Sequence, residues 1–304
     1  MTMMRMTKSE DNEEVAAVPM PAPLPGLIRR LSTRLEAHPT GLEPRLPELS
    51  GIRAVAFDIY GTLFISGSGD IGTAATGGRE EAMRAVLAQA GLADPPREGL
   101  VGRFLGHIRS DHARLHAEGV EFPEVEIREI WKSFLAGLGL RPEPAEIERM
   151  AVEYECAVNP VWPMPGLAEL LTALRARGLP LAIVSNAQFF TPLLFDAFLD
   201  APPEALGFPP DLSVWSYAHR RAKPGAFLYR RLAEALAPRG IAPEQTLYIG
   251  NDMRNDIAPA AATGFRTALF AGDKRSLRLR EEDGPGATPD AVATDLAQIP
   301  GIAG

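Results

Sequence analysis

The sequence predicts an α/β protein in which a parallel sheet, covered by helices on both faces, is interrupted by a helical insert. Apolar runs of strand length recur along the chain, and each ends in polar residues, as in 52–58 and 181–186. Runs that are apolar throughout are typical of strands buried on both faces of a parallel sheet. Between the first run and the later ones, residues 74–158 follow the spacing of helices.

Composition limits the range of functions. The chain has 304 residues, 46% of them hydrophobic, which suits one large or two modest globular domains. Its formal net charge of −8 argues against a nucleic-acid partner, because phosphate backbones are bound by clustered Lys and Arg. An anionic substrate would need a local positive site.

The cytoplasm is the location that the sequence predicts. Cys156 is the only cysteine, so an intramolecular disulfide is not possible and a reducing compartment is expected. No apolar stretch reaches the length of a membrane span, and acidic residues within 10–14 stand where a signal peptide would be apolar. We therefore expect no membrane partner, and the sequence does not indicate the oligomeric state.

Residues 1–50 are predicted to form a disordered tail and a linker with one short helix. Up to about residue 26, acidic residues and prolines leave too little apolar surface to order the chain. Leu27, Ile28, Leu31 and Leu35 then recur at helical spacing. Such a helix could lie on a membrane surface, but a short helix before a proline-rich linker is more often docked on its own domain.

The first buried strand has a carboxylate at its end. Residues 52–57 are apolar apart from Arg53, and Asp58 follows directly. Open parallel sheets bind ligands at the carboxyl ends of their strands, and Gly61 allows the sharp turn that would expose Asp58 there. Asp58 is therefore a candidate nucleophile.

Glycines at 67, 69 and 72 match the spacing of a dinucleotide-binding loop. That loop opens a helix directly after its strand, and an acidic residue ends the next strand. Here the glycines begin well past the strand, and the following segment has helical spacing. A flexible hinge is the favoured interpretation, with nucleotide binding as the alternative.

The helical insert carries a polar stretch at 107–116 that holds three of the five histidines. His112 and His116 lie four apart on one helix face, which suits a metal, but the sequence places no third ligand beside them. A solvated face is the favoured interpretation. Alternatively, Arg109, His112 or Arg114 points into a cleft and contacts the substrate.

Two later segments bring polar groups to the same edge. The second apolar run leads to Ser185 and Asn186, whose hydroxyl and backbone N–H suit an oxyanion or a phosphate. A short strand at 212–217 then precedes Lys223, and Pro224 is predicted to start a helix.

A fourth strand, 246–250, is followed by Asp252 and Asp256. Two carboxylates four residues apart at a strand end repel one another, so such a pair usually holds a cation or a lysine between its members. Small residues after Asp256 allow a helix to pack closely on the sheet, and the last strands are predicted at 267–270 and 291–293.

In this order, the four strand ends resemble those of the haloacid dehalogenase superfamily of hydrolases. The resemblance covers about residues 51–300, and four short motifs in the same order and spacing make it specific. It implies a Rossmann-like three-layer core formed by 51–73 and 159–304, with 74–158 as a mobile helical cap. The motifs are Phe57-Asp58-Ile59-Tyr60-Gly61-Thr62-Leu63, Val184-Ser185-Asn186, Lys223-Pro224 and Gly250-Asn251-Asp252-Met253-Arg254-Asn255-Asp256.

The resemblance implies that Asp58 attacks the substrate and forms a covalent aspartyl intermediate. Ser185, the backbone N–H of Asn186 and Lys223 would hold the charge of the transferring group, and Thr62 would also contact the substrate. The substrate is expected to be a small anionic molecule.

A Mg²⁺ site is also implied by the resemblance. Asp252 would join Asp58 and the backbone carbonyl of Tyr60 around the ion, and Asp256 would belong to this shell or pair with Lys223. The ion would screen the repulsion between an anionic aspartate and a phosphate dianion.

Position 60 departs from the phosphatases of the superfamily, which usually have a second Asp there as general acid and base. This chain has Tyr60, as the superfamily's dehalogenases do, and a departing halide needs no proton. The Asp252 and Asp256 pair instead resembles that of the metal-dependent phosphatases.

We therefore predict a Mg²⁺-dependent phosphatase that acts on a small phosphorylated metabolite, with the missing proton donated by a cap residue such as His112. One alternative is a 2-haloacid dehalogenase. The other is a binding or regulatory protein that keeps the fold without turnover.

Overall fold

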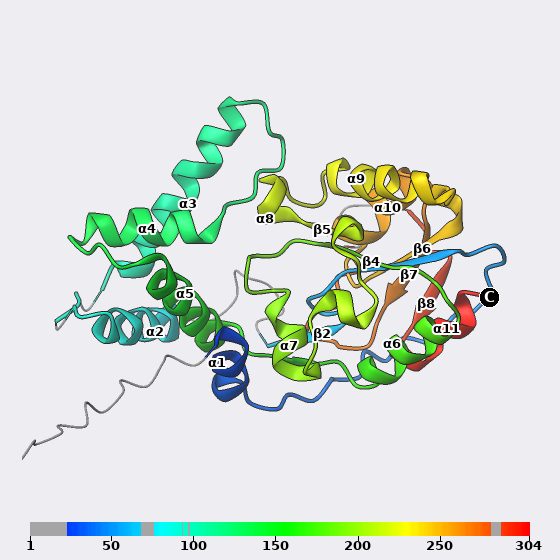
Figure 1. Ribbon diagram of the computed structural model, residues 1–304, viewed down its shortest axis with the longest axis horizontal. Helices are drawn as coiled ribbons and strands as arrows, with labels where there is room; N and C mark the ends of the chain where they lie inside the picture. The colour runs from blue at the N-terminus through cyan, green and yellow to red at the C-terminus, as the bar shows by residue number, and fades with distance from the viewer. Residues whose placement is uncertain (1–22, 68–75, 93, 97, 281–286) are drawn as a thin grey trace, which may run out of the picture.

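Six parallel strands form the main sheet of the computed structural model, which describes residues 23–67, 76–92, 94–96, 98–280 and 287–304. In spatial order they are β5 (Ser213–Trp215), β4 (Leu181–Ser185), β1 (Ala54–Phe57), β6 (Thr246–Gly250), β7 (Arg266–Phe270) and β8 (Ala291–Ala293). The predicted parallel sheet is confirmed, and β1, which ends directly before Asp58, lies in its interior (Figure 1).

Helices cover both faces of this sheet. Successive side chains of a strand point to opposite faces, so Val55 and Phe57 of β1 join one apolar cluster while Ala54 and Ala56 join another. The first cluster is covered by α6 (Leu167–Ala176), α7 (Leu193–Leu199) and α11 (Ile299–Ile302), and the second by α9 (Phe227–Leu236) and α10 (Ala258–Ala262) (Figure 1). This is the three-layer α/β fold that the sequence predicts.

A two-stranded antiparallel ribbon joins the insert to the core. β2 (Phe64–Ser66) leads into the insert and pairs with β3 (Val161–Pro163), which leads out of it. Where the chain leaves and returns, the Gly67 N–H donates to the Pro160 carbonyl at 2.7 Å. The described helices between them are α2 (Thr76–Gln89), α3 (Leu100–Ala117), α4 (Ile127–Gly137) and α5 (Pro144–Val158).

The insert has an aromatic centre. Phe104 of α3 packs against Trp131 and Phe134 of α4, with ring centroids 4.9 and 5.4 Å away. The predicted stripe on α5 contributes Ile147 and Met150, which are both buried. The helices lie to one side of the sheet, beyond the strand ends (Figure 1).

The first described helix, α1 (Leu24–Leu31), is docked on its own chain. Leu27 and Ile28 are buried, and the helix contacts both α5 of the insert and α7 of the core. It begins at Leu24, within the segment predicted as a tail, and ends before Leu35. Residues 1–22, the rest of that tail, lie outside the described residues.

Residues 32–50 are held on the core, although they were predicted as a linker. Arg45 forms an antiparallel bridge with Val292 of β8, and the Leu49 N–H donates to the Ile302 carbonyl at 2.8 Å. These contacts satisfy part of the open edge of the sheet, which is why a proline-rich segment can lie there in a fixed position.

Two local predictions were wrong. The short strand ends at Trp215 and is followed by α8 (Ser216–His219), and α9 begins at Phe227 rather than at Pro224. A turn precedes α9 instead, in which the Gly225 N–H donates to the Ala222 carbonyl at 3.1 Å. Of the glycines considered for nucleotide binding, those at 69 and 72 lie outside the described residues.

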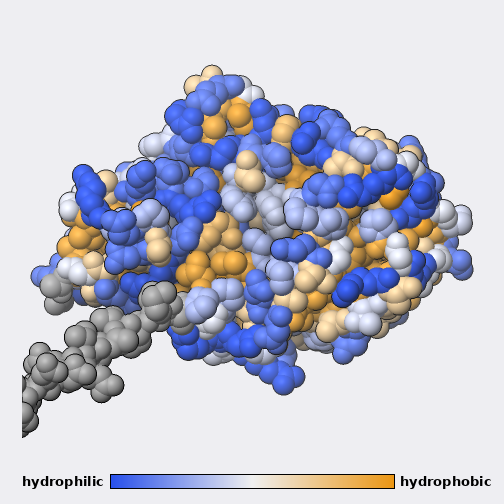
Figure 2. Space-filling view, viewed as in Figure 1, coloured by the Kyte–Doolittle hydropathy of each residue, from blue (hydrophilic) through white to orange (hydrophobic). Residues whose placement is uncertain are grey.

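Polar residues cover most of the face shown in Figure 2, with apolar residues in small groups between them. The exposed large apolar side chains of the described residues are Leu31, Leu46, Leu105 and Leu279. None of the described helices is both long and apolar enough to cross a bilayer.

Candidate active site

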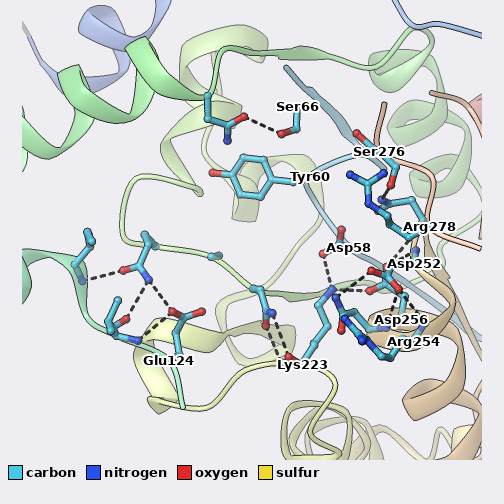
Figure 3. A pocket seen from close by; sticks show the side chains of 18 of the residues that line it. Asp58, Tyr60, Ser66, Glu124, Lys223, Asp252, Arg254, Asp256, Ser276 and Arg278 are labelled. Carbon is cyan, nitrogen blue, oxygen red and sulfur yellow. Dashed lines mark hydrogen bonds and ion pairs between the residues drawn. The ribbon is translucent and has the colours of Figure 1, made fainter. Parts of the chain in front are cut away.

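A cavity of about 480 Å³ lies between the strand ends and the insert. Asp58 follows β1, Lys223 follows α8, and Asp252 and Asp256 follow β6. Four of the predicted residues therefore line one cavity, although they are far apart in sequence (Figure 3).

Asp58 lines this cavity and is fixed by two donors, Lys223, which also lines it, and Ser185, which is buried behind it. The Ser185 hydroxyl, at the end of β4, donates to Asp58 Oδ1 at 2.9 Å, and Lys223 Nζ donates to the same oxygen at 2.7 Å. Asp58 and Lys223 are only 6% and 7% exposed, so these contacts are shielded from water. Such shielding strengthens a charge-assisted hydrogen bond.

Lys223 lies between two carboxylates. Its Nζ also donates to Asp256 Oδ1 at 2.6 Å. Burial alone would lower the pKa of Lys223, but the carboxylates of Asp256 and Asp58 outweigh it and raise that pKa above its usual value. The lysine is therefore charged at neutral pH.

Asp256 uses its oxygens on protein donors, which does not favour the ligand role predicted for it. Oδ1 accepts from Lys223 and from the Tyr248 hydroxyl, and Oδ2 accepts from the N–H groups of Asn251 and Asp252. These contacts instead match the alternative, in which Asp256 pairs with Lys223.

At two positions beside the site, neighbouring atoms lie so close to the backbone that only glycine fits. Gly61 has φ +83°, and a Cβ there would lie 2.5 Å from Ser276 Cβ and 2.7 Å from Asn251 Nδ2. At Gly250, a Cβ would lie 2.4 Å from Asp256 Cγ. Real Cβ atoms do not approach so closely, so only glycine fits at either position.

Asp252 forms an ion pair with Arg280. Arg280 donates to its Oδ2 at 2.7 Å, while the N–H groups of Arg254 and Asn255 donate to Oδ1 at 2.9 and 3.1 Å. Burial alone would raise the pKa of Asp252, but these hydrogen bonds hold it below its usual value. Asp252 is thus an anion whose partner is a protein cation.

The implied Mg²⁺ can be tested against these contacts. No group of three His, Cys, Asp or Glu side chains in the described part of the chain is arranged to hold a metal, and this includes the His112 and His116 pair. Asp58 Oδ2 has no hydrogen-bond donor among the described residues. Asp252 fits the ion once the Arg280 guanidinium, which is 19% exposed, withdraws from it.

Tyr60 lines the cavity, and its hydroxyl is paired with another side chain. Its hydroxyl is 3.0 Å from Thr191 Oγ1. Burial and the nearby Glu155 raise the pKa of this hydroxyl far above its usual value. The Tyr60 hydroxyl is therefore protonated at neutral pH.

The remaining predicted residues lie in different places. Asn186 lines the cavity, and its Oδ1 accepts from the Lys223 N–H at 2.7 Å. Thr62 is buried and donates to Asn251 Oδ1 at 3.1 Å, outside the cavity lining. His112 lines the cavity, whereas Arg109 is exposed and the structure does not bring it to the site.

Sequence reasoning missed several cavity residues. They come from a loop of the insert, from the loop after β4 and from the region after β7, and are Glu124, Gln188, Ser276, Arg278 and Arg280. Loop residues carry no periodicity that would assign them to a site. The three arginines within 275–280 could have pointed to this loop, because an anionic substrate needs local positive charge.

Known proteins similar to this chain are phosphatases and dehalogenases. The phosphoglycolate phosphatase of Escherichia coli (strain K12) is 36% identical over 116 residues, which is 36% of this chain and only 40% of that protein's length. A solved 2-haloacid dehalogenase from Pseudomonas syringae pv. Tomato DC3000 is 22% identical, covers 83% of this chain and 97% of its own, and has a TM-score of 0.51. An L-2-haloacid dehalogenase from Xanthobacter autotrophicus is 21% identical, covers 82% and 97%, and has a TM-score of 0.46.

A family model covers the site as well as the fold. The model of the haloacid dehalogenase-like hydrolases matches residues 52–264, which is more than half of the chain and includes Asp58, Ser185, Lys223 and Asp252. The chain therefore belongs to the haloacid dehalogenase-like hydrolases.

Proposed function

We propose that this hydrolase cleaves the phosphate ester of a small anionic metabolite, with Asp58 as the nucleophile. The observation that carries the proposal is the fixed Asp58 carboxylate in a cavity that Lys223, Arg254, Arg278 and Arg280 also line. A phosphate dianion approaches a carboxylate only where nearby positive charge offsets the repulsion. The likeness to phosphoglycolate phosphatase supports the same substrate class.

The side chains around Asp58 have distinct tasks in this proposal. Ser185 and Lys223 hold Asp58 Oδ1, so Oδ2 is the oxygen left to attack phosphorus. The Lys223 ammonium and the Asn186 N–H stabilise the charge on the transferring group. Asp256 keeps Lys223 in place and charged.

We expect Mg²⁺ to bind between Asp58, Asp252 and the Tyr60 carbonyl, with Arg280 displaced. When bound, the ion supplies positive charge that screens the carboxylate from the phosphate. A cytoplasmic location is also part of the proposal, supported by the single cysteine.

Phosphate release from a panel of small phosphate esters tests the proposal. We expect turnover with Mg²⁺, loss of turnover with EDTA, and no turnover in Asp58→Asn, because an amide is a poor nucleophile. Asp70→Asn, an acidic residue outside the motifs, is the matched control. A wild-type protein that releases no phosphate from any ester contradicts the proposal.

A second candidate is carbon–halogen hydrolysis, favoured by the charge pairing of the two carboxylates. Lys223 and Arg280 pair with Asp256 and Asp252. The Tyr60 hydroxyl, whose pKa is raised by burial, is a weak acid, and a departing halide needs no proton. Halide release from 2-haloacids in the presence of EDTA would favour this candidate over the phosphatase.

A further inference from the structure

The proposed reaction needs a proton donor that position 60 does not supply. The alkoxide leaving group of an ordinary phosphate ester must be protonated, and general acids typically contribute about 10²- to 10⁴-fold. Residue 60 is a tyrosine rather than a carboxylic acid, and its hydroxyl is engaged with Thr191 Oγ1 at 3.0 Å. Another side chain of the cavity must therefore act as the acid.

The insert presents two carboxylic acids to this cavity, Glu124 and Glu155. Glu155 accepts from Asn159 Nδ2 at 3.0 Å within its own helix end, whereas Glu124 is attached to the core. It lies between α3 and α4, and its backbone is paired with the loop that leads to Lys223. The Ala222 N–H donates to the Phe122 carbonyl at 2.8 Å, and the Glu124 N–H donates to the Arg220 carbonyl at 3.2 Å. This ladder fixes Glu124 relative to the catalytic lysine.

The Glu124 side chain is also held by the core. Oε2 accepts from the Ser216 hydroxyl at 2.8 Å, and Oε1 accepts from Val125 N at 3.0 Å and Gln188 Nε2 at 3.3 Å. Figure 3 shows Glu124 on the side of Asp58 away from Asp252 and Arg278. Glu124 therefore lines the cavity at a distance from the residues that would hold the metal.

The environment tunes this carboxyl for proton transfer near neutrality. Burial raises the pKa of Glu124 to about 7, although Ser216, the Val125 N–H and Arg220 oppose the shift. Arg220 is itself paired with Asp111 of α3, which reduces its effect. A carboxyl that titrates near the working pH can act first as an acid and then as a base.

We infer that Glu124 is the general acid and base of this active site, supplied by the insert in place of residue 60. As Asp58 Oδ2 forms its bond to phosphorus and the ester P–O bond breaks, Glu124 gives its proton to the leaving oxygen. The Glu124 carboxylate then takes a proton from the water that attacks the aspartyl phosphate. The bond from phosphorus to Asp58 breaks, and inorganic phosphate leaves with Asp58 and Glu124 restored.

His112, the donor expected from the sequence, suits the task less well. Its Nε2 is buried and has no hydrogen-bond partner among the described residues. Burial lowers the pKa of its imidazole, which is therefore neutral at the pH where an acid is needed.

The inference rests on the proposed phosphatase activity, and leaving-group dependence tests it. In Glu124→Gln, kcat/KM for an alkyl phosphate is expected to fall about 10²- to 10⁴-fold, while that for p-nitrophenyl phosphate falls by less than about tenfold. The nitrophenolate departs without a proton, so only the alkyl ester needs the acid. An initial burst of nitrophenol is also expected, since hydrolysis of the aspartyl phosphate loses its base.

Glu121→Gln, at an exposed position of the same segment, is the matched control and should leave both rates unchanged. In Ser216→Ala, the alkaline limb of the kcat/KM profile should move to higher pH, because a hydrogen bond that lowers the Glu124 pKa is lost.

Equal losses for the two esters in Glu124→Gln overturn the inference but leave the phosphatase intact. The same holds if His112→Gln alone shows the leaving-group dependence. A wild-type protein that hydrolyses neither ester overturns both proposals.

Discussion

Asp252 can serve either of two cations. Two backbone N–H groups fix its orientation from within its own turn, and Arg280 neutralises it from the loop after β7. The backbone N–H groups donate to Oδ1, whereas the shortest contact of Arg280 is with Oδ2. A divalent ion and Arg280 therefore compete for one side chain.

Arg280→Gln is expected to tighten binding of a divalent ion by about tenfold, which corresponds to about 1.4 kcal/mol. The glutamine cannot form the ion pair, so the metal no longer has to displace a positive charge. Calorimetric titration with Mn²⁺ measures this without any turnover. Arg275→Gln, whose arginine pairs with Asp273 on the same loop, is the control. Weaker binding in Arg280→Gln would contradict the competition.

Among the elements, the ends of the central strands could be predicted from the sequence, whereas the loop residues of the site could not. Buried apolar runs bounded by polar residues located β1, β4 and β6, because a buried strand allows few polar residues within it. The start of α9 was predicted wrongly at Pro224, because the fixed φ of proline suits a turn as well as a helix start. Glu124 reaches the site through contacts with the distant Ser216, which no local pattern encodes.

The turn after β1 depends on one glycine. Gly61→Ala is expected to lower the free energy of unfolding by about 2 kcal/mol or more, because it adds a clash with Ser276 to the strain of a positive φ. Gly41→Ala separates the two effects, since Gly41 has φ +80° and no atom within 4 Å of its Cβ position. Urea denaturation measures both variants. Equal losses would mean that the clash is absent.

In the whole molecule, the core and the insert are attached to one another at several places. The ribbon of β2 and β3 joins them, the 122–124 ladder joins them beside Lys223, and α1 contacts both. We propose that residues 74–158 act as a cap over the core formed by 51–73 and 159–304. The sequence indicated the cap's helices, whereas these attachments depend on tertiary contacts.

The attachment through α1 can be weakened by one substitution. Ile28 is 2% exposed, so Ile28→Ala should lower the free energy of unfolding by about 2 to 5 kcal/mol through loss of packing. Leu31, on the same helix, is 44% exposed, and Leu31→Ala should change it by less than about 0.5 kcal/mol. Thermal or urea unfolding of the two variants tests this. Similar small losses would mean that α1 is not docked.

The ladder between Phe122 and Ala222 also supplies a built-in reporter. The Ala222 amide hydrogen is covered only while the two segments remain paired, since it donates across from core to insert. Its exchange with deuterium in solvent would thus record each separation of cap from core. Slowing of that exchange by a bound phosphate mimic would reveal how strongly the ligand closes the molecule.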